Sequence, residues 1–148
     1  MRHQRLYAGT DAVRLFAYGS LLPGLSNHPV IEPYLLHAFP GKVGGELVDV
    51  GPYPAMMLRT DRFVRGMWMD VRRAGLPALD ELEGFAGIEE RNDYERVWVK
   101  DAVAPGISGW TYVWPDARGY PPADADWWPD ALARKTEDYP EGEGNDFT

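Results

Sequence analysis

The sequence contains no cysteine among its 148 residues. This absence excludes disulfide bonds, a thiolate nucleophile and a zinc site with cysteine ligands. It leaves the redox compartment undecided, because a chain without thiols tolerates either.

Basic residues are scarce relative to acidic ones, with 15 Lys and Arg against 23 Asp and Glu and a formal net charge of -8. Nucleic-acid binding needs a basic patch, and anionic membranes attract polybasic runs, so neither partner is expected. No apolar run approaches the length of a membrane span, and residues 1–7 carry charge without the apolar segment of a secretory signal. We therefore expect a cytoplasmic protein.

Bulky side chains are abundant, with 6 Trp and 8 Tyr in a sequence that is 45% hydrophobic. This length and composition fit one domain with a single core. We expect the domain over residues 14–135, a polar lead-in at 1–13 and an acidic, glycine-rich tail at 136–148. No internal repeat is present, and the oligomeric state is unknown.

The hydrophobic pattern predicts an α+β fold with five or six strands. Period-two alternation or short apolar runs bounded by Gly and Pro indicate strands. They fall at residues 14–22, 42–50, 55–58, 62–71, 94–100 and 109–114, with a bulge at Gly44–Gly45. The clearest helix covers 77–83, a second is expected at 126–134, and one or two helical turns fit in 30–39. Many short strands with one inserted helix predict a small, mostly antiparallel β-barrel.

The stretch Leu15–Leu22 is an apolar strand that breaks at Gly19-Ser20. Gly19 allows a sharp bend or a close approach to the backbone, because it has no Cβ. The N–H groups of Gly19, Ser20, Leu21 and Leu22 follow, and such a cluster suits an anion or a developing oxyanion. The alternative is a core strand followed by an ordinary loop.

Glu83 is the acid of the predicted helix that falls within its apolar stripe, four residues after Leu79. Asp80 falls at the edge of the stripe, and Glu81 faces almost opposite. Burial and the negative end of the helix dipole would both raise the pKa of Glu83, which suits a general acid/base. The alternative is a helix-terminal glutamate that reaches solvent or pairs with an arginine.

Other chemical motifs are missing. Ser20 lacks a nucleophile elbow, no phosphate-binding loop is present, and the three histidines have no metal-ligand spacing. No metal or cofactor is therefore expected. Tyr94, Arg96 and Trp98 lie on one side of their strand and could line a pocket; the alternative is cross-strand packing with Arg96 directed outward.

Several motifs in order resemble the gamma-glutamylcyclotransferase-like family, which includes the gamma-glutamylamine cyclotransferases and the plant avirulence-induced proteins. They are Phe-Ala-Tyr-Gly-Ser-Leu at 16–21, Asn-His at 27–28, Gly-Glu-Leu at 45–47, Val-Gly-Pro-Tyr-Pro-Ala at 50–55, Val-Arg-Gly at 64–66, Leu-Asp-Glu-Leu-Glu-Gly at 79–84, Tyr-Glu-Arg-Val at 94–97 and Trp-Thr-Tyr at 110–112. The resemblance covers roughly residues 15–114.

The resemblance implies a small mixed, mostly antiparallel β-barrel with one helix beside its cavity. It also implies that the backbone of Tyr18, Gly19, Ser20 and Leu21 holds a gamma-glutamyl group. It implies that Glu83 is the general acid/base, and that Tyr94 and Arg96 belong to a Tyr-x-Arg element near the site. The spacer 85–93 and the aromatic, acidic C-terminal extension are less typical of the family, which leaves the substrate open.

The reaction implied is release of 5-oxoproline and an amine or amino acid from a small-molecule gamma-glutamyl amide. The α-amine attacks the γ-carbonyl within the same molecule, so proximity is largely supplied by the substrate. Two other functions stay open. One is a non-catalytic module that binds a small ligand in the same cavity. The other is a tailoring enzyme that removes a gamma-glutamyl group from a larger metabolite.

Overall fold

The structure, a computed structural model, describes residues 11–83 and 94–138. The strands are β1 (Ala12–Ala17), β2 (Leu35–Asp49), β3 (Pro54–Arg72), β4 (Glu95–Lys100) and β5 (Ser108–Val113). The helices are α2 (His28–Ile31), α3 (Leu76–Glu83) and α4 (Trp128–Asp138), with 3₁₀ turns at Glu32–Tyr34 and Arg73–Gly75. The α+β class is therefore confirmed.

The five strands form one sheet in the order β2-β3-β1-β5-β4. The β1–β5 pair is parallel and the other pairs are antiparallel, as expected for a mixed, mostly antiparallel sheet. The expected barrel is not closed, because within the described residues the edge strands β2 and β4 form no ladder with each other. The sheet nevertheless places the ends of β1 and β5 next to each other, where the site lies.

Asp101 connects the two edges in place of a strand ladder. Its Oδ1 accepts hydrogen bonds from the Lys42 backbone N–H of β2 and from Trp68 Nε1–H, both at 2.9 Å. Its Oδ2 accepts from the backbone N–H groups of Val103 (3.0 Å) and Ala104 (2.8 Å). Burial alone would raise the pKa of Asp101, but these four donors favour the carboxylate and hold the pKa below its usual value of 3.8.

We expect Asp101→Asn to lower the free energy of unfolding by about 2–3 kcal/mol, because an amide NH₂ would face N–H donors and leave them unsatisfied. Since the pKa of folded Asp101 is lowered, its stabilisation is present above about pH 3.8 and is lost as the pH falls through the folded-state value. Urea unfolding should therefore show a difference between wild type and variant that shrinks below pH 3.8. Asp61→Asn is the matched control, because Asp61 is exposed and bonds only to Arg59 among the described residues; an equal loss in the control would contradict this role of Asp101.

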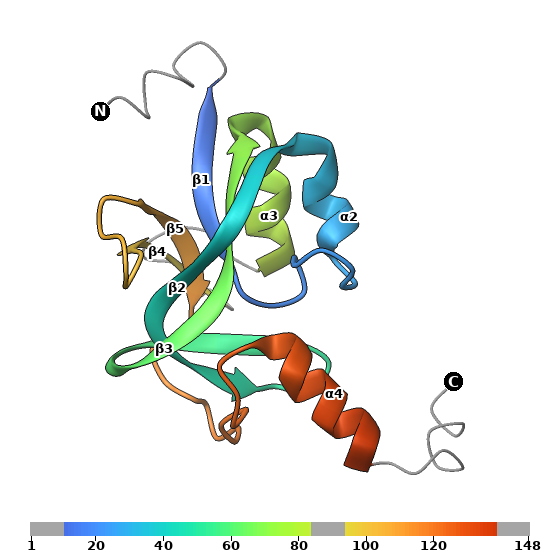
Figure 1. The fold of residues 1–148 in the computed structure, drawn as a ribbon. Helices are drawn as coiled ribbons and strands as arrows, with labels where there is room; N and C mark the ends of the chain where they lie inside the picture. The colour runs from blue at the N-terminus through green and yellow to red at the C-terminus, as the bar shows by residue number, and fades with distance from the viewer. Residues whose placement is uncertain (1–10, 84–93, 139–148) are drawn as a thin grey trace.

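Alternation along the strands sends side chains to two hydrophobic clusters. In β1, Val13, Leu15 and Ala17 belong to the cluster beneath α2 and α3, whereas Phe16 belongs to the other cluster with the fully buried Trp68. The second cluster also contains Trp128 of α4. Figure 1 shows this arrangement: α2 and α3 lie together beside the upper part of the sheet, and α4 lies against the lower part of β2 and β3.

Several boundaries differ from the predicted ones. The runs 55–58 and 62–71 are parts of one strand, β3, which pairs with β2 along nearly its whole length. The predicted irregularity at Gly44–Gly45 is confirmed by a register shift there. A Cβ on Gly44 would lie 2.5 Å from the Arg59 carbonyl oxygen, so the close approach of the two strands requires glycine.

Two elements near the ends of the chain reach beyond their predicted limits. Strand β1 begins at Ala12, within the expected lead-in, and α4 begins two residues later than predicted and reaches Asp138. The proposed domain limits of 14 and 135 stay a prediction, and residues 1–10 and 139–148 lie outside the described part. Within the described part, no helix is long and apolar enough to cross a membrane.

Candidate active site

A cavity of about 430 Å³ opens where β1 ends. It is formed by the turn after β1, the β2–β3 connection, the last turn of α3, the end of β5 and the loop after β5. Its lining residues are Phe16, Ala17, Tyr18, Gly19, Ser20, Leu21, Asn27, Val50, Tyr53, Pro54, Leu82, Tyr94, Tyr112, Trp114, Arg118 and Tyr120. This size suits a small-molecule ligand.

The turn after β1 is fixed by its own hydrogen bonds. The Leu22 N–H donates to the Gly19 carbonyl (2.9 Å), and the Asn27 side chain and backbone donate to the Ser20 hydroxyl and carbonyl oxygens, both at 2.9 Å. Within the described chain, the N–H groups of Gly19, Ser20 and Leu21 donate to no acceptor. The turn therefore lines the cavity with three backbone donors that a ligand oxygen can accept from.

Gly19 is required by packing. A Cβ at this position would lie 2.7 Å from Pro54 Cγ, so any side chain would push the turn away from the β2–β3 connection. The predicted sharp break at Gly19 thus corresponds to a close approach between two cavity walls. Both walls line the cavity.

Aromatic side chains form much of the remaining wall. The Tyr18 hydroxyl donates to the Tyr112 carbonyl (2.6 Å), and the Tyr94 hydroxyl donates to the Pro54 carbonyl (2.9 Å). These buried bonds fix the rings by tying different strands together. Trp114 packs against Tyr94 with 5.7 Å between ring centroids, and its buried Nε1–H has no acceptor within the described residues. An unpaired buried donor is costly unless water or a ligand supplies the acceptor.

Asp80 attaches α3 to the sheet. Arg96 Nη1 of β4 donates to both carboxylate oxygens at 2.9 and 2.8 Å, and the Tyr112 hydroxyl of β5 donates to Oδ1 at 2.7 Å. The side chains of Asp80 and Arg96 are only about one-fifth exposed, at 20% and 21%. The prediction that Asp80 lies at the edge of the apolar stripe therefore missed a half-buried carboxylate with two partners.

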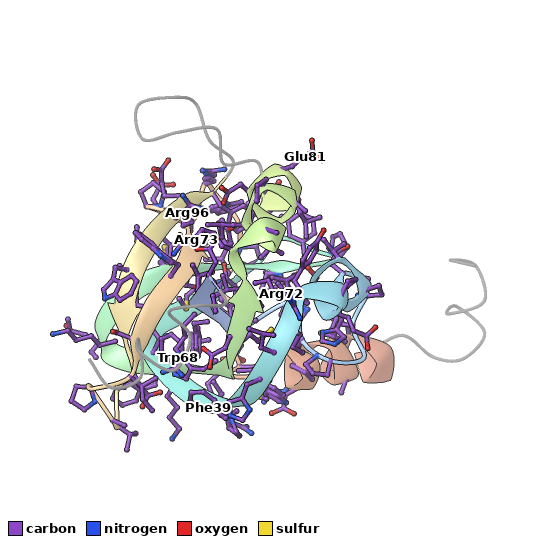
Figure 2. All side chains as sticks on the ribbon, turned by 90° about the horizontal axis from the view of Figure 1, so that it is seen from above. Phe39, Trp68, Arg72, Arg73, Glu81 and Arg96 are labelled. Atoms are coloured by element: carbon purple, nitrogen blue, oxygen red, sulfur yellow. The ribbon has the colours of Figure 1, made fainter. Side chains whose placement is uncertain are left out.

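The other two acids of α3 are Glu81 and Glu83. Glu81 is exposed and points away from the sheet, as predicted (Figure 2). Glu83 is the last residue of α3 and directly follows Leu82, which lines the cavity. The side chain of Glu83 lies outside the described part, so its role stays a prediction.

Five of the predicted binding residues line the cavity together, namely Tyr18, Gly19, Ser20, Leu21 and Tyr94. Arg96 does not belong to the lining and instead bonds to Asp80. Sequence reasoning missed four lining residues from loops, Asn27, Tyr53, Arg118 and Tyr120. The Asn-His motif at 27–28 and the Val-Gly-Pro-Tyr-Pro-Ala motif at 50–55 offered signals for Asn27 and Tyr53. Within the described residues, no group of three His, Asp or Glu side chains is placed to hold a metal ion.

The fold and the site together define a class: a small α+β protein with a ligand-sized cavity between a strand-end turn and the end of a short acidic helix. A family model described as "Gamma-glutamyl cyclotransferase, AIG2-like" matches residues 15–130. The chain therefore belongs to the gamma-glutamyl cyclotransferase, AIG2-like family.

A curated relative is the gamma-L-glutamyl-butirosin B gamma-glutamyl cyclotransferase of Niallia circulans, which is 35% identical over 103 residues. The match covers 68% of this chain and 65% of the relative, slightly less than two thirds of the relative's length.

Solved structures share the fold. A mouse AIG2-like protein is 25% identical with a TM-score of 0.51, and the match covers 82% of each chain. A uropathogenic E. coli-specific protein is 14% identical with a TM-score of 0.63, over 82% of this chain and 96% of that one. An Arabidopsis thaliana protein is 24% identical with a TM-score of 0.57, over 86% and 78%.

Proposed function

We propose that this protein is a gamma-glutamylcyclotransferase that converts a gamma-glutamyl amide into 5-oxoproline and a free amine or amino acid. The observation that carries the proposal is the cavity itself. It combines the N–H groups of residues 19–21, which bond to no acceptor in the described part of the chain, with the end of the helix that bears Glu83. Family membership and the activity named for the Niallia circulans relative support it.

The turn 18–21 holds the gamma-glutamyl part of the substrate in this proposal. Carboxylates and developing oxyanions both bind well to clustered backbone N–H groups. These donors are fixed before the substrate arrives, because Asn27 and Leu22 already hold the turn in place. The aromatic wall of Tyr94 and Trp114 excludes water from the folded glutamyl chain, and Tyr94 thereby acts as a binding residue.

Glu83 carries out the two proton transfers. It removes a proton from the α-ammonium, and the resulting amine attacks the γ-carbonyl carbon to form a tetrahedral intermediate. The bond from that carbon to the leaving nitrogen then breaks as Glu83 returns its proton to that nitrogen. The second proton of the former α-amine passes from the ring nitrogen to the released amine, which leaves as an ammonium ion. The sum is gamma-glutamyl amide to 5-oxoproline plus amine, with no water consumed.

Arg96 supports the site through Asp80. The ion pair holds α3, and with it the position of Glu83, against β4 and β5. The proposal therefore keeps Arg96 near the site but gives it a positioning role. The cytoplasmic location and a small-molecule partner stay predictions.

The test is turnover by the purified protein of gamma-glutamyl-alanine, glutathione, gamma-glutamyl-ε-lysine and a gamma-glutamyl polyamine, with 5-oxoproline followed by mass. We expect release of 5-oxoproline and amine in equal amounts from at least one compound. Protection against thermal unfolding by these compounds without product would instead indicate a binding module.

A further inference from the structure

Arg118 is the one formally charged residue among the described residues that line the cavity. It comes from the loop after β5, and its side chain is exposed, whereas Gly19 and Leu21 of the turn after β1 are buried. A gamma-glutamyl group held by the turn 18–21 therefore occupies the buried part, and the leaving amine extends toward the exposed rim. This step rests on the proposed function.

The backbone at Arg118 has an unfavourable conformation. Its φ is +52°, and Gly119 follows with a φ of +84°. Consecutive positive φ values suit Asn, Asp or Gly in a turn, and an arginine there costs stability. The turn is held by the Arg118 N–H donating to Asp116 Oδ1 and by the Tyr120 N–H donating to the Ala117 carbonyl, both at 2.9 Å. Strain of this kind is concentrated at binding sites.

The strained turn places the guanidinium over the cavity wall. Arg118 Cζ lies 4.2 Å from the centroid of the Trp114 ring, a cation–π distance that holds the side chain at the rim. Asp116 bonds to the backbone of Arg118, and within the described part of the chain no carboxylate pairs with its guanidinium. Arg14, Arg59 and Arg96, in contrast, all pair with carboxylates.

A guanidinium that pairs with no carboxylate of residues 11–83 and 94–138, held at the rim of an aromatic cavity, suits an anionic group on the ligand. The indole that Arg118 covers also carries the unpaired Nε1–H, a second donor on the same wall. We propose that Arg118 recognises a carboxylate on the leaving group, so that the preferred substrates are gamma-glutamyl amides of an amino acid, a peptide or another carboxylate-bearing amine.

The test compares two substrates of similar size, gamma-glutamyl-alanine and gamma-glutamyl-ethylamide, which differ by the leaving-group carboxylate and share the α-carboxylate. In the wild type, kcat/KM for gamma-glutamyl-alanine divided by that for gamma-glutamyl-ethylamide measures the preference for the carboxylate. In Arg118→Asn this ratio should fall about tenfold, as expected for loss of one charged hydrogen-bonding partner. Because asparagine tolerates positive φ, the Tm of the variant should lie within a few degrees of the wild-type Tm or above it.

Arg65→Asn is the matched control. Arg65 is also exposed and also lies over an indole, with its Cζ 5.0 Å from the Trp127 ring centroid, but it does not line the cavity. Its substrate ratio should equal that of the wild type, and Arg118→Lys should keep most of the preference.

A ratio of kcat/KM values that is unchanged in Arg118→Asn would overturn the proposal. If both kcat/KM values fell by the same factor, Arg118 would bind the α-carboxylate that the two substrates share. If the wild type turned over neither compound nor any other member of the panel, the proposed function would fail by itself. Calorimetry would then give the Kd values of the two compounds and decide the question of the carboxylate subsite. Tighter binding of gamma-glutamyl-alanine by the wild type that is lost in Arg118→Asn would support the subsite. Equal Kd values in the wild type would overturn it.

Discussion

Glu83→Gln is expected to lower kcat by about 10³- to 10⁴-fold, because one carboxylate supplies both proton transfers and glutamine supplies neither. The amide keeps the shape of the side chain at the end of α3. Substrate binding, which the account assigns to the turn 18–21, should change little. The measurement is release of 5-oxoproline under saturating substrate, with Kd for the same substrate obtained by calorimetry.

Glu81→Gln is the control for this variant. It makes the same chemical change two residues earlier on the same helix, where the side chain is exposed and points away from the sheet. Its kcat should match that of the wild type. A folded Glu83→Gln protein that retains turnover would remove Glu83 from the mechanism and direct attention to other proton acceptors.

Asp80→Ala is expected to lower both stability and turnover. The change removes the Asp80 carboxylate from its ion pair with the half-buried Arg96 guanidinium and from its hydrogen bond with the Tyr112 hydroxyl. Breaking such a pair costs several kcal/mol when it is fully buried, and we expect about 2–3 kcal/mol here because one-fifth of each side chain is exposed. Since α3 then loses its attachment, kcat should fall by about 10- to 100-fold while KM changes little.

The double variant Asp80→Ala/Arg96→Met separates positioning from stability. Removing the cation that has lost the Asp80 carboxylate should restore part of the free energy of unfolding, measured in urea. It should not restore kcat, because α3 still lacks its contact with β5. If kcat recovered together with stability, Asp80 would affect turnover only by changing the fraction of folded protein, and its positioning role would be wrong.

The strand-and-turn region was predictable because its signals are local. An apolar run ended by Gly19-Ser20 predicted β1 and its turn, and alternation over 62–71 predicted the second half of β3. The pair Gly44–Gly45 predicted the register shift because glycine pairs commonly mark bulges. The resemblance to the family added the proposed role of residues 18–21, but it assigned no role to the loop residues that line the cavity with them, Asn27, Tyr53, Arg118 and Tyr120.

The long-range contacts were not predictable, because each partner is specified by a distant segment. Helical periodicity placed Asp80 at the edge of an apolar stripe, but its burial depends on Arg96, sixteen residues later on β4. Asp101 shows no local motif, yet it joins both edges of the sheet. Arg118 lies in an ordinary Pro-Asp-Ala-Arg-Gly loop, and only the folded chain brings that loop to the cavity.

The most direct test of the central claim is the reaction run in H₂¹⁸O with a gamma-glutamyl amide that the protein accepts. Intramolecular attack by the α-amine consumes no water, so the account predicts 5-oxoproline without ¹⁸O, released in equal amount with the free amine. Glutamate carrying ¹⁸O would show that water attacks the γ-carbonyl, and it would contradict cyclotransfer as the reaction of this cavity.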